Sequence, residues 1–371
     1  MATAKRIGVL TSGGDAPGMN AAIRAATLVG RAQGAEIVGI ERGYRGLLED
    51  AVVPLAPADV AGILREGGTI LGSARCKEFH HREVRDRARA VLANRGIDGL
   101  IVIGGNGSLT GALRLADPDE LRGQALSIVG VPASIDNDLG LTGLSIGVDT
   151  AMNTIVEACD KIADTATAHD RTFIVEVMGR DCGYLAMTSA IAVGADLALF
   201  PEAGKPEAAI VEQIVDTVLT VRSRARRTRR VIIIKAEGVS IPIERLKAEV
   251  DAELRRRAPD ADPAGIETRV TVLGHVVRGG RPSAFDRLLG SRLGNVAVRT
   301  LLAGISHKMI AWMPPVELAP EAGVRSAADP YCWLVDLVAV LAETANLLQG
   351  KTQLARWRAG AFDEIEDALL L

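Results

Sequence analysis

The chain has 371 residues, which at about 150 residues per domain predicts two domains rather than one small module. Charged residues make up 24% and the formal net charge is −3, which excludes a nucleic-acid binder that relies on overall phosphate attraction. No apolar run approaches the roughly 18 residues needed to cross a bilayer, so no membrane partner is expected. Aromatic residues are only 3% against 39 Gly, which predicts an aliphatic core and a backbone that approaches ligands closely.

The cysteines and the first residues bear on the cellular compartment. Cys76, Cys159, Cys182 and Cys332 are far apart and form no CxxC pair, so neither a zinc site nor a disulfide framework is expected. Residues 1–6 lead into a strand-like run without the apolar region of a signal peptide. We therefore expect a cytoplasmic protein.

Short apolar runs alternate with helical stretches, which is the pattern of an α/β fold with mainly parallel sheets. Along the chain, the expected strands are 7–11, 36–40, 99–103, 127–131, 172–177, 231–235 and 271–273. The expected helices include 19–33, 83–95, 207–223 and 243–257. We expect a surface loop at 258–265, an interruption at 319–330 and a helical tail at 333–349.

Two glycine-rich segments follow expected strands. The first, TSGGDAPGMN at residues 11–20, leads into a helix, and the second, IVIGGNGS at residues 101–108, does the same. Glycines permit a tight turn, and the first turn of the following helix presents N–H groups that can bind a phosphate. Such turns also occur without a ligand, but two of them in one chain favour a phosphate-binding site.

A pair of carboxylates follows the strand at 127–131. Asp136 and Asp138 are two residues apart, so in an extended segment their side chains point to the same side. One carboxylate could then take a proton from a hydroxyl group while the other holds the same substrate. The alternative is an Asx turn or a helix cap.

Basic side chains are scattered along the second half of the sequence. Arginine forks and histidine suit the phosphate of a sugar phosphate, although each arginine alone could be a solvated surface charge. The candidates are His169, Arg171, Arg180, Arg269, His275 and Arg278. The run at residues 224–230, with five arginines, is interpreted as a solvated face or an effector or interface patch.

Considered together with GYRGL at 43–47, LGSAR at 71–75 and VEVMGR at 175–180, these segments resemble the 6-phosphofructokinase family, in order from Ile7 to about Leu302. The resemblance implies two similar three-layer lobes with mainly parallel sheets and the active site between them. The larger nucleotide-binding lobe would be 1–147 plus about 276–318. The smaller sugar-phosphate-binding lobe would be 148–275 plus about 319–371, including the C-terminal tail.

The resemblance also implies an activity, the transfer of the γ-phosphoryl group of ATP to the 1-hydroxyl of fructose 6-phosphate in glycolysis. Asp136 would be the general base, Asp138 would hold the sugar, and Arg180 with Gly14 would stabilise the transferred phosphoryl group, roles that suit a reaction driven by positioning and charge neutralisation. The nucleotide would contact Gly14, Tyr44, Arg75, Cys76, Gly105, Asn106, Gly107, Ser108 and Gly111.

The same resemblance assigns the sugar phosphate. Its contacts would come from Ser134, Asp136, Asp138, Met178, Gly179, Arg180, Glu237, His275 and Arg278. Arg171 and Arg269 would reach the 6-phosphate from a neighbouring subunit, which implies a homotetramer or a homodimer with shared active sites.

Some positions distinguish this chain within the family. Gly107 and Ala133 resemble the ATP-dependent type, because pyrophosphate-dependent members have Asp and Lys there. Asn106 stands where the family usually has an acidic residue for Mg²⁺, and loss of such a partner costs on the order of 10- to 100-fold in affinity or activity. Cys76 and His80 replace an aromatic residue and an arginine near the nucleotide.

Two alternatives therefore stay open. One is a phosphotransferase of the same fold that uses pyrophosphate or another ketose phosphate, such as sedoheptulose 7-phosphate. The other is a weakly active regulatory subunit that binds a sugar phosphate.

Overall fold

The computed structural model describes residues 6–121, 123, 125–223, 229–260, 267–314 and 323–353. The chain divides into two compact units. Unit 1 consists of Met1–Thr150 and Arg278–Leu347, and unit 2 consists of Ala151–Val277 and Leu348–Leu371.

Unit 1 is built on an eight-stranded sheet in the order β11-β12-β10-β5-β4-β1-β2-β3. The central strands β2, β1, β4, β5 and β10 run parallel, and β3, β12 and β11 pair antiparallel at the two edges. The strands are β1 (Arg6–Ser12), β2 (Glu36–Ile40), β3 (Val52–Pro54), β4 (Gly99–Gly104), β5 (Ser127–Pro132), β10 (Lys308–Trp312), β11 (Val324–Arg325) and β12 (Cys332–Asp336).

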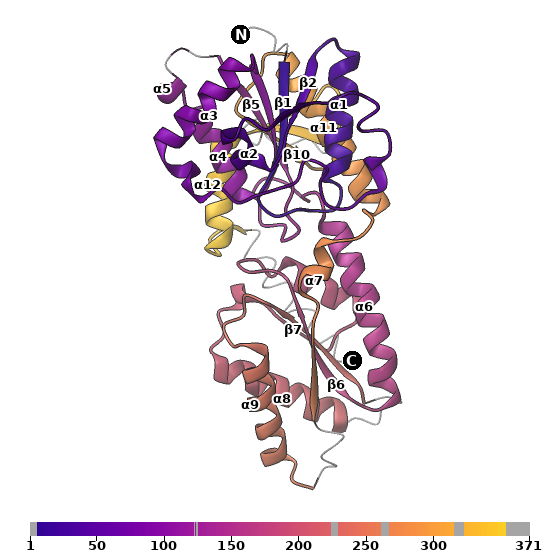
Figure 1. Ribbon diagram of the computed structural model, residues 1–371. Helices are drawn as coiled ribbons and strands as arrows, with labels where there is room; N and C mark the ends of the chain where they lie inside the picture. The colour runs from indigo at the N-terminus through magenta and orange to yellow at the C-terminus, as the bar shows by residue number, and fades with distance from the viewer. Residues whose placement is uncertain are drawn as a thin grey trace. The chain divides into compact units, whose positions relative to one another are not determined.

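Helices cover both faces of this sheet (Figure 1). On one face, α1 (Met19–Ala32) packs against α11 (Ala284–Leu302). On the other lie α2 (Gly43–Leu48), α3 (Arg82–Asn94), α4 (Asn106–Leu115) and α12 (Leu337–Leu348), with the short α5 (Pro118–Leu121) nearby. Single-turn helices occur at η1 (Ile63–Arg65) and η2 (Lys77–His80). The strands β1, β4 and β5 are buried almost throughout, as expected of parallel strands covered on both sides.

Small residues allow α1 and α11 to approach closely. A Cβ atom added at Gly290 would lie 2.6 Å from the Gly18 carbonyl oxygen, and one added at Gly294 would lie 2.4 Å from the carbonyl oxygen of Ala22. Both distances are shorter than any van der Waals contact, so only glycine fits. This contact fixes the start of α1, and with it the glycine-rich turn that precedes the helix.

Unit 2 contains a four-stranded parallel sheet in the order β7-β8-β6-β9. Its strands are β6 (Thr172–Val177), β7 (Leu197–Leu199), β8 (Val231–Ala236) and β9 (Thr268–Val272). Its helices are α6 (Val148–Ala168), whose first turn belongs to unit 1, α7 (Tyr184–Val193), α8 (Glu207–Ser223) and α9 (Ile243–Arg257), with single turns at η3 (Pro201–Ala203) and η4 (Gly274–Arg278). The α6 and α7 helices lie on one side of the sheet and α8 with α9 on the other (Figure 1).

The expected α/β class with mainly parallel sheets is confirmed. Six of the expected strands and the four expected helices lie where the sequence placed them, with ends that differ by one residue at most. The expected strand at 271–273 is shifted, because β9 begins at Thr268 and pairs with β6 from Thr172 onward. The expected loop 258–265 and basic run 224–230 lie largely outside the described residues.

The C-terminal expectations need correction. The predicted helical tail 333–349 is a strand followed by a helix: β12 pairs antiparallel with β10 before α12 begins at Leu337. A short apolar run is compatible with either a strand or a helix. Here the pairing with the distant strand β10 makes the segment a strand. The expected assignment of residues after 318 to the smaller lobe is wrong for β11, β12 and nearly all of α12, which belong to unit 1.

Across the described ranges, none of the helices has the length and apolar character needed to cross a membrane.

Candidate active site

The two glycine-rich turns of unit 1 meet because of the strand order. The chain moves from β1 through α1 to β2 on one side, and from β4 through α4 to β5 on the other. Right-handed crossovers in opposite directions place α1 and α4 on opposite faces and leave a crevice at the carboxyl ends of β1 and β4. Ligands of open α/β sheets bind at such a switch point.

Close contacts confirm that three turns touch at this edge. A Cβ atom added at Gly104 would lie 2.5 Å from the Ser12 carbonyl oxygen, so the ends of β4 and β1 require glycine there. One added at Gly13 would lie 3.1 Å from Ser108 Oγ in the first turn of α4. One added at Gly105 would lie 3.6 Å from Cβ of Ser134, in the turn after β5. The turns after β1, β4 and β5 therefore form one continuous surface.

A fourth segment, residues 66–73, is held against the glycine-rich turn by side chains. Ser73 Oγ donates a hydrogen bond of 2.7 Å to the carbonyl oxygen of Gly13, and Thr11 Oγ1 donates one of 2.8 Å to that of Gly72. Asn20 in α1 accepts from the N–H of Ile70 at 2.8 Å and donates to Glu66 O at 3.1 Å. The segment leads directly to Arg75, which is exposed, and to half-buried Cys76.

Two of the residues predicted to contact the nucleotide support the first turn of α4 from behind. The Tyr44 ring is only 4% exposed and stacks on Phe79, with centroids 4.1 Å apart. Its hydroxyl donates to the Ser108 carbonyl oxygen at 2.6 Å, and burial raises the Tyr44 pKa well above its usual value. A Cβ atom added at Gly111 would lie 2.8 Å from this ring. Tyr44 is therefore buried beneath the first turn of α4, whereas Gly111 is half-buried beside its ring.

The first turn of α4 is open to a ligand. Gly105 precedes the helix, and no side chain caps its first N–H groups. An exposed Gly107 follows, and a Cβ atom added there would meet no atom within 4 Å. Gly107 has no positive φ and no close neighbour, so neither backbone conformation nor packing requires glycine at this position. The space beside Gly107 is therefore available to a bound anion at the helix N-terminus.

Asn106, the predicted metal position, is half-buried in the same turn. Among the described residues, no group of three or more His, Cys, Asp or Glu side chains is arranged to hold a metal ion. A Mg²⁺ ion held mainly by nucleotide phosphates needs only one or two protein oxygens and keeps several waters. The amide oxygen of Asn106 fits that limited requirement.

The turn after β5 presents the carboxylate pair. Asp138 accepts a hydrogen bond of 2.7 Å from Ser134 Oγ, and both aspartates are partly exposed. Asn137 between them has a φ of 50° and is buried, with its amide bonded to Gly143 O at 3.1 Å and its carbonyl accepting from Ser145 N at 3.0 Å. The segment is thus a turn fixed by the buried asparagine, not the extended stretch that the sequence predicted, and it holds Asp136 and Asp138 after the carboxyl end of β5.

Arg278 also belongs to this site of unit 1. Its Nη1 would lie 2.6 Å from a Cβ atom added at Gly14, and it donates to the carbonyl oxygen of Asp15 at 3.3 Å. The sequence assigned Arg278 to the sugar phosphate and Gly14 to phosphoryl transfer. In the structure, the guanidinium of Arg278 lies against the backbone of Gly14.

Unit 2 has a switch point of its own, between β6 and β8. The chain leaves β6 through α7 in one direction and leaves β8 through α9 in the other. The turns that follow these strands carry four predicted residues, Met178, Gly179, Arg180 and Glu237.

Backbone contacts bind these two turns to each other. Gly238 N donates to the Gly179 carbonyl oxygen at 3.1 Å, and a Cβ atom added at Gly238 would lie 1.8 Å from that of Arg180. Gly179 has a φ of 130°, which favours glycine. Arg180 and Glu237 are exposed on these turns, where both are accessible to a ligand.

The remaining predicted phosphate ligands lie at opposite ends of the strands of this sheet. His275 is exposed in η4, which follows the carboxyl end of β9. Arg171 immediately precedes β6, and Arg269 is the second residue of β9, paired in register with Phe173. Six residues of strand span about 20 Å. Within one unit, Arg171 and Arg269 therefore lie near the amino ends of the strands, whereas Arg180 follows the carboxyl end of β6.

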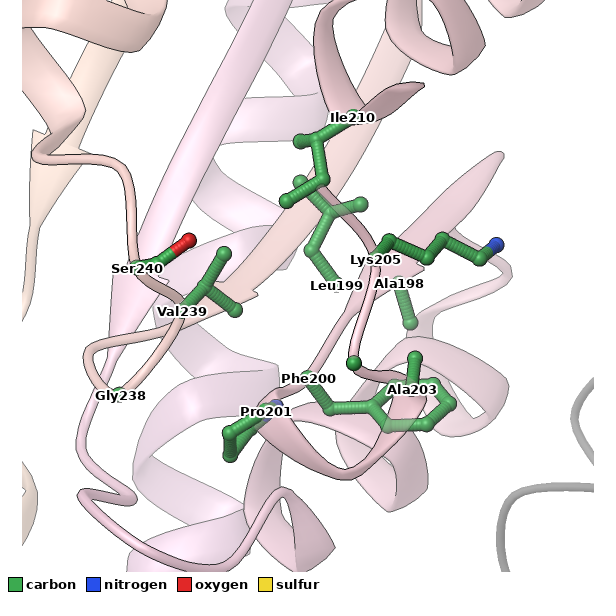
Figure 2. Close-up of a pocket in the computed structure, with 11 residues that line it drawn as sticks. Ala198, Leu199, Phe200, Pro201, Ala203, Lys205, Ile210, Gly238, Val239 and Ser240 are labelled. Atoms are coloured by element: carbon green, nitrogen blue, oxygen red, sulfur yellow. The ribbon is translucent and has the colours of Figure 1, made fainter. Parts of the chain in front are cut away.

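A cavity of about 250 Å³ adjoins the Glu237 turn (Figure 2). It is lined chiefly by apolar side chains after β7 and β8, including Leu199, Phe200 and Val239, and it also touches Gly238. Its lining includes none of the residues that the sequence predicted for catalysis or phosphate binding.

Sequence reasoning missed several residues that position the site. Ser73 lies within the quoted LGSAR segment, but its bond to Gly13 depends on the fold. Asp286 in α11 is buried and accepts hydrogen bonds from Gly147 N at 2.7 Å and from Thr150 N at 2.8 Å, so it caps the start of α6 from another helix. Lys235 is 1% exposed within the apolar strand β8. A single charged residue in such a strand could have been recognised from the sequence as a residue that positions the site.

Glycine-rich turns at the switch points of two mainly parallel sheets are typical of α/β proteins that bind phosphate groups. A family model described as Phosphofructokinase matches residues 6–301. The chain belongs to the phosphofructokinase family.

Individual relatives agree with this assignment. An ATP-dependent 6-phosphofructokinase of Thermotoga neapolitana is 46% identical over 307 residues, which cover 83% of this chain and 89% of that protein. The structure of phosphofructokinase from Saccharomyces cerevisiae is 35% identical with a TM-score of 0.80 and covers 99% of this chain, which spans 50% of the yeast chain. A pyrophosphate-dependent phosphofructokinase from Marinobacter aquaeolei, with a TM-score of 0.74 over 96% of this chain and 91% of its own, is 20% identical and shows the shared fold alone.

Proposed function

We propose that this chain is an ATP-dependent 6-phosphofructokinase, which transfers the γ-phosphoryl group of ATP to the 1-hydroxyl of fructose 6-phosphate. The observation that carries the proposal is the meeting of three turns at one edge of unit 1, where Gly13, Gly105 and Ser134 touch neighbouring turns. This arrangement supports a site in which helix N–H groups for phosphates would lie next to the Asp136 and Asp138 carboxylates. Names of relatives such as the Thermotoga neapolitana protein support the same activity.

The residues divide the chemical work in a way that suits phosphoryl transfer. Asp136 takes the proton of the sugar hydroxyl, while Asp138, positioned by Ser134, holds the sugar. The backbone at Gly14 and the nearby Arg278 guanidinium would offset charge on the phosphoryl group. The same role is proposed for Arg180. The reaction depends on such positioning and charge neutralisation more than on covalent chemistry.

Gly107 supports ATP rather than pyrophosphate as the donor. A larger side chain would project into open space without disturbing the fold, so its absence leaves room for the ligand. An aspartate at this place would repel the α-phosphate of a nucleotide. Ala133 is 2% exposed at the end of β5, which leaves no surface cation beside the donor at that position.

Mg²⁺ belongs to the proposal as the ion that accompanies ATP. When bound, it neutralises charge on the nucleotide phosphates. Asn106 would supply a neutral oxygen ligand, directly or through water. We expect a higher Mg²⁺ requirement than an aspartate would give, because the amide lacks the negative charge.

The proposed enzyme is cytoplasmic and works as a homotetramer or homodimer with shared active sites. Arg171 and Arg269 support this assembly, since within their own unit they lie at the opposite edge of the sheet from Arg180. A neighbouring subunit would bring their guanidinium groups to the 6-phosphate. Size-exclusion chromatography with light scattering tests the assembly, and a stable monomer with full activity would contradict it.

Steady-state assays of the purified protein test the activity itself. The assays compare ATP with pyrophosphate, and fructose 6-phosphate with sedoheptulose 7-phosphate, across Mg²⁺ concentrations. The proposal expects the highest kcat/KM with ATP and fructose 6-phosphate, and a lower Mg²⁺ requirement in Asn106→Asp. Higher kcat/KM with pyrophosphate or with the other sugar would favour the alternative phosphotransferase. No turnover with any pair, and no rescue by Asn106→Asp, would favour a regulatory binding subunit.

A further inference from the structure

An ion pair is buried at the carboxyl edge of the unit 2 sheet. Lys235 in β8 and Glu176 in β6 are paired in register, and Lys235 Nζ donates to Glu176 Oε2 at 2.8 Å. The side chain of Lys235 is 1% exposed and that of Glu176 is 16% exposed. Taking two charges out of water is costly, and apolar residues of similar size often give equal or greater stability. Stability alone therefore does not explain why this sheet contains the pair.

The position of the pair connects it with the sugar-phosphate turns. Glu176 is two residues before Met178, and Lys235 is two residues before Glu237. Lys235 Nζ also lies 3.3 Å from the carbonyl oxygen of Ala236, to which it donates. The next residues hold the two turns together, since Glu237 N donates to the Val177 carbonyl oxygen at 2.9 Å. The Lys235 ammonium is therefore bonded to the backbone directly before the Glu237 turn, and the Glu176 carboxylate lies two residues before Met178.

The two members of the pair should have opposite effects on a bound phosphate group. The proposed ligand of these turns carries a phosphate group, and an uncompensated Glu176 carboxylate in the sheet below would repel it. Electrostatic interactions in a protein interior are screened much less than in water. The Lys235 ammonium offsets this carboxylate while the pair is intact.

We propose that Lys235 is a positioning residue for sugar-phosphate binding, which neutralises Glu176 and holds the carbonyl oxygen of Ala236 beneath the Glu237 turn. This inference rests on the proposed function in placing fructose 6-phosphate at the Met178–Arg180 and Glu237 turns. It makes a prediction that a purely structural role does not. Removal of the cation weakens binding of the anionic sugar, whereas removal of the carboxylate does not.

The experiment compares Lys235→Met, Glu176→Gln and the double variant in the full-length protein. Both single variants should lower the melting temperature, because each leaves one buried charge without its partner. Lys235→Met should raise the KM for fructose 6-phosphate by about tenfold and change the KM for ATP less than about twofold. Glu176→Gln should leave the sugar KM at or below the wild-type value. The double variant should return the sugar KM to within about threefold of wild type.

Three results would overturn the inference: an equal rise in sugar KM in both single variants, an equal rise in the KM for ATP, or no recovery in the double variant. If Lys235→Met does not fold, Glu176→Gln alone decides, because a rise in its sugar KM contradicts the charge argument. Calorimetric binding of fructose 6-phosphate without ATP separates this inference from the proposed function. A protein that binds the sugar without phosphorylating it fails the proposed function, and the same asymmetry is then measured in Kd. No binding of the sugar by the wild type overturns both.

Discussion

The guanidinium of Arg278 lies against the backbone of Gly14: a Cβ atom added at Gly14 would be 2.6 Å from Arg278 Nη1. The two residues are 264 positions apart in sequence, and the Ala151–Val277 part of unit 2 lies between them in the chain. The turn after β1 therefore gains a cation that no local sequence supplies. This contact places a positive charge beside the backbone to which the phosphoryl group is assigned.

Gly14→Ala should displace Arg278 and lower activity. The added methyl group would overlap the guanidinium, which as the end of a flexible side chain can move away. We expect kcat to fall by about tenfold or more, because removal of a charge-stabilising donor typically costs on the order of 100-fold. Gly62→Ala is the matched control, since a Cβ atom there meets nothing within 4 Å. An unchanged kcat in Gly14→Ala, measured by steady-state kinetics, would contradict this role of the contact.

Gly107→Asp should change the donor preference while the fold is retained. The side chain would project into open space beside the first turn of α4, and its charge would repel the nucleotide. We expect the KM for ATP to rise by about tenfold or more, with the KM for fructose 6-phosphate little changed. The melting temperature should stay close to that of the wild type. Gly104→Ala provides the contrast, because its Cβ would lie 2.5 Å from the Ser12 carbonyl oxygen and should destabilise the protein.

Asp136→Ser should remove most of the activity. A positioned general base contributes about 10²- to 10⁴-fold, and serine cannot accept the hydroxyl proton at neutral pH. Binding of ATP, followed by calorimetry, should remain near the wild-type value. Asp260→Asn changes an exposed carboxylate in the loop after α9 and should have no effect on kcat. A kcat of Asp136→Ser close to the wild-type value would exclude Asp136 as the base.

Subunit mixing tests the shared site. Arg171→Ala and Asp136→Ser should each be poorly active alone, the first through sugar-phosphate binding and the second through chemistry. In a mixed oligomer, an intact Asp136 in one subunit can be combined with an intact Arg171 from its neighbour. We expect activity above the sum of the separate variants after they are denatured and refolded together. Strictly additive activity, in oligomers shown to be mixed, would contradict shared sites.

Acid stability should depend on Glu120. Its carboxylate accepts from Arg85 at 2.5 Å and also from Arg89, and these guanidinium groups, Arg85 foremost, lower the Glu120 pKa to about 2. The unfolded chain, with the ordinary value of 4.5, binds a proton first as the pH falls. This stabilisation is therefore fully present above about pH 4.5 and is lost toward pH 2.

Glu120→Gln should destabilise the protein at neutral pH by about 3 kcal/mol, because it leaves buried Arg85 without a carboxylate partner and leaves buried Arg89 with Asp86 alone. Urea unfolding between pH 3 and pH 7 should show a smaller pH dependence in the variant than in the wild type. Asp50→Asn, which breaks an exposed ion pair with Arg95, should change stability little. Equal pH dependence of wild type and Glu120→Gln would refute the assignment.

Local pattern predicted the elements that carry chemistry. The apolar runs before the TSGGDAPGMN and IVIGGNGS segments are buried strands β1 and β4. The first following helix begins at Met19 as predicted, but the second begins at Asn106, earlier than the predicted start near Leu109. Parallel pairing of β4 with β5 brings the turn that holds Asp136 to the same end of the sheet as the second glycine-rich turn.

Contacts between distant segments could not be predicted from local sequence patterns. The β12 strand was predicted as helix because only its pairing with β10 distinguishes the two. The bond from Tyr44 to Ser108, the Asp286 cap of α6 and the Lys235–Glu176 pair all join residues that no short motif contains. Asn106 and Gly107 were identified from the resemblance, but only the structure shows that the space at Gly107 is open.

The central claim is transfer of the γ-phosphoryl group of ATP to fructose 6-phosphate. The most direct measurement follows the label from γ-³²P-ATP in the presence of Mg²⁺ and fructose 6-phosphate, with the product identified by chromatography and ³¹P NMR. We predict a labelled fructose 1,6-bisphosphate with the label on the 1-phosphate, and its loss in Asp136→Ser. Release of labelled inorganic phosphate alone, or a labelled product only when ³²P-labelled pyrophosphate replaces the labelled ATP, would contradict this reaction.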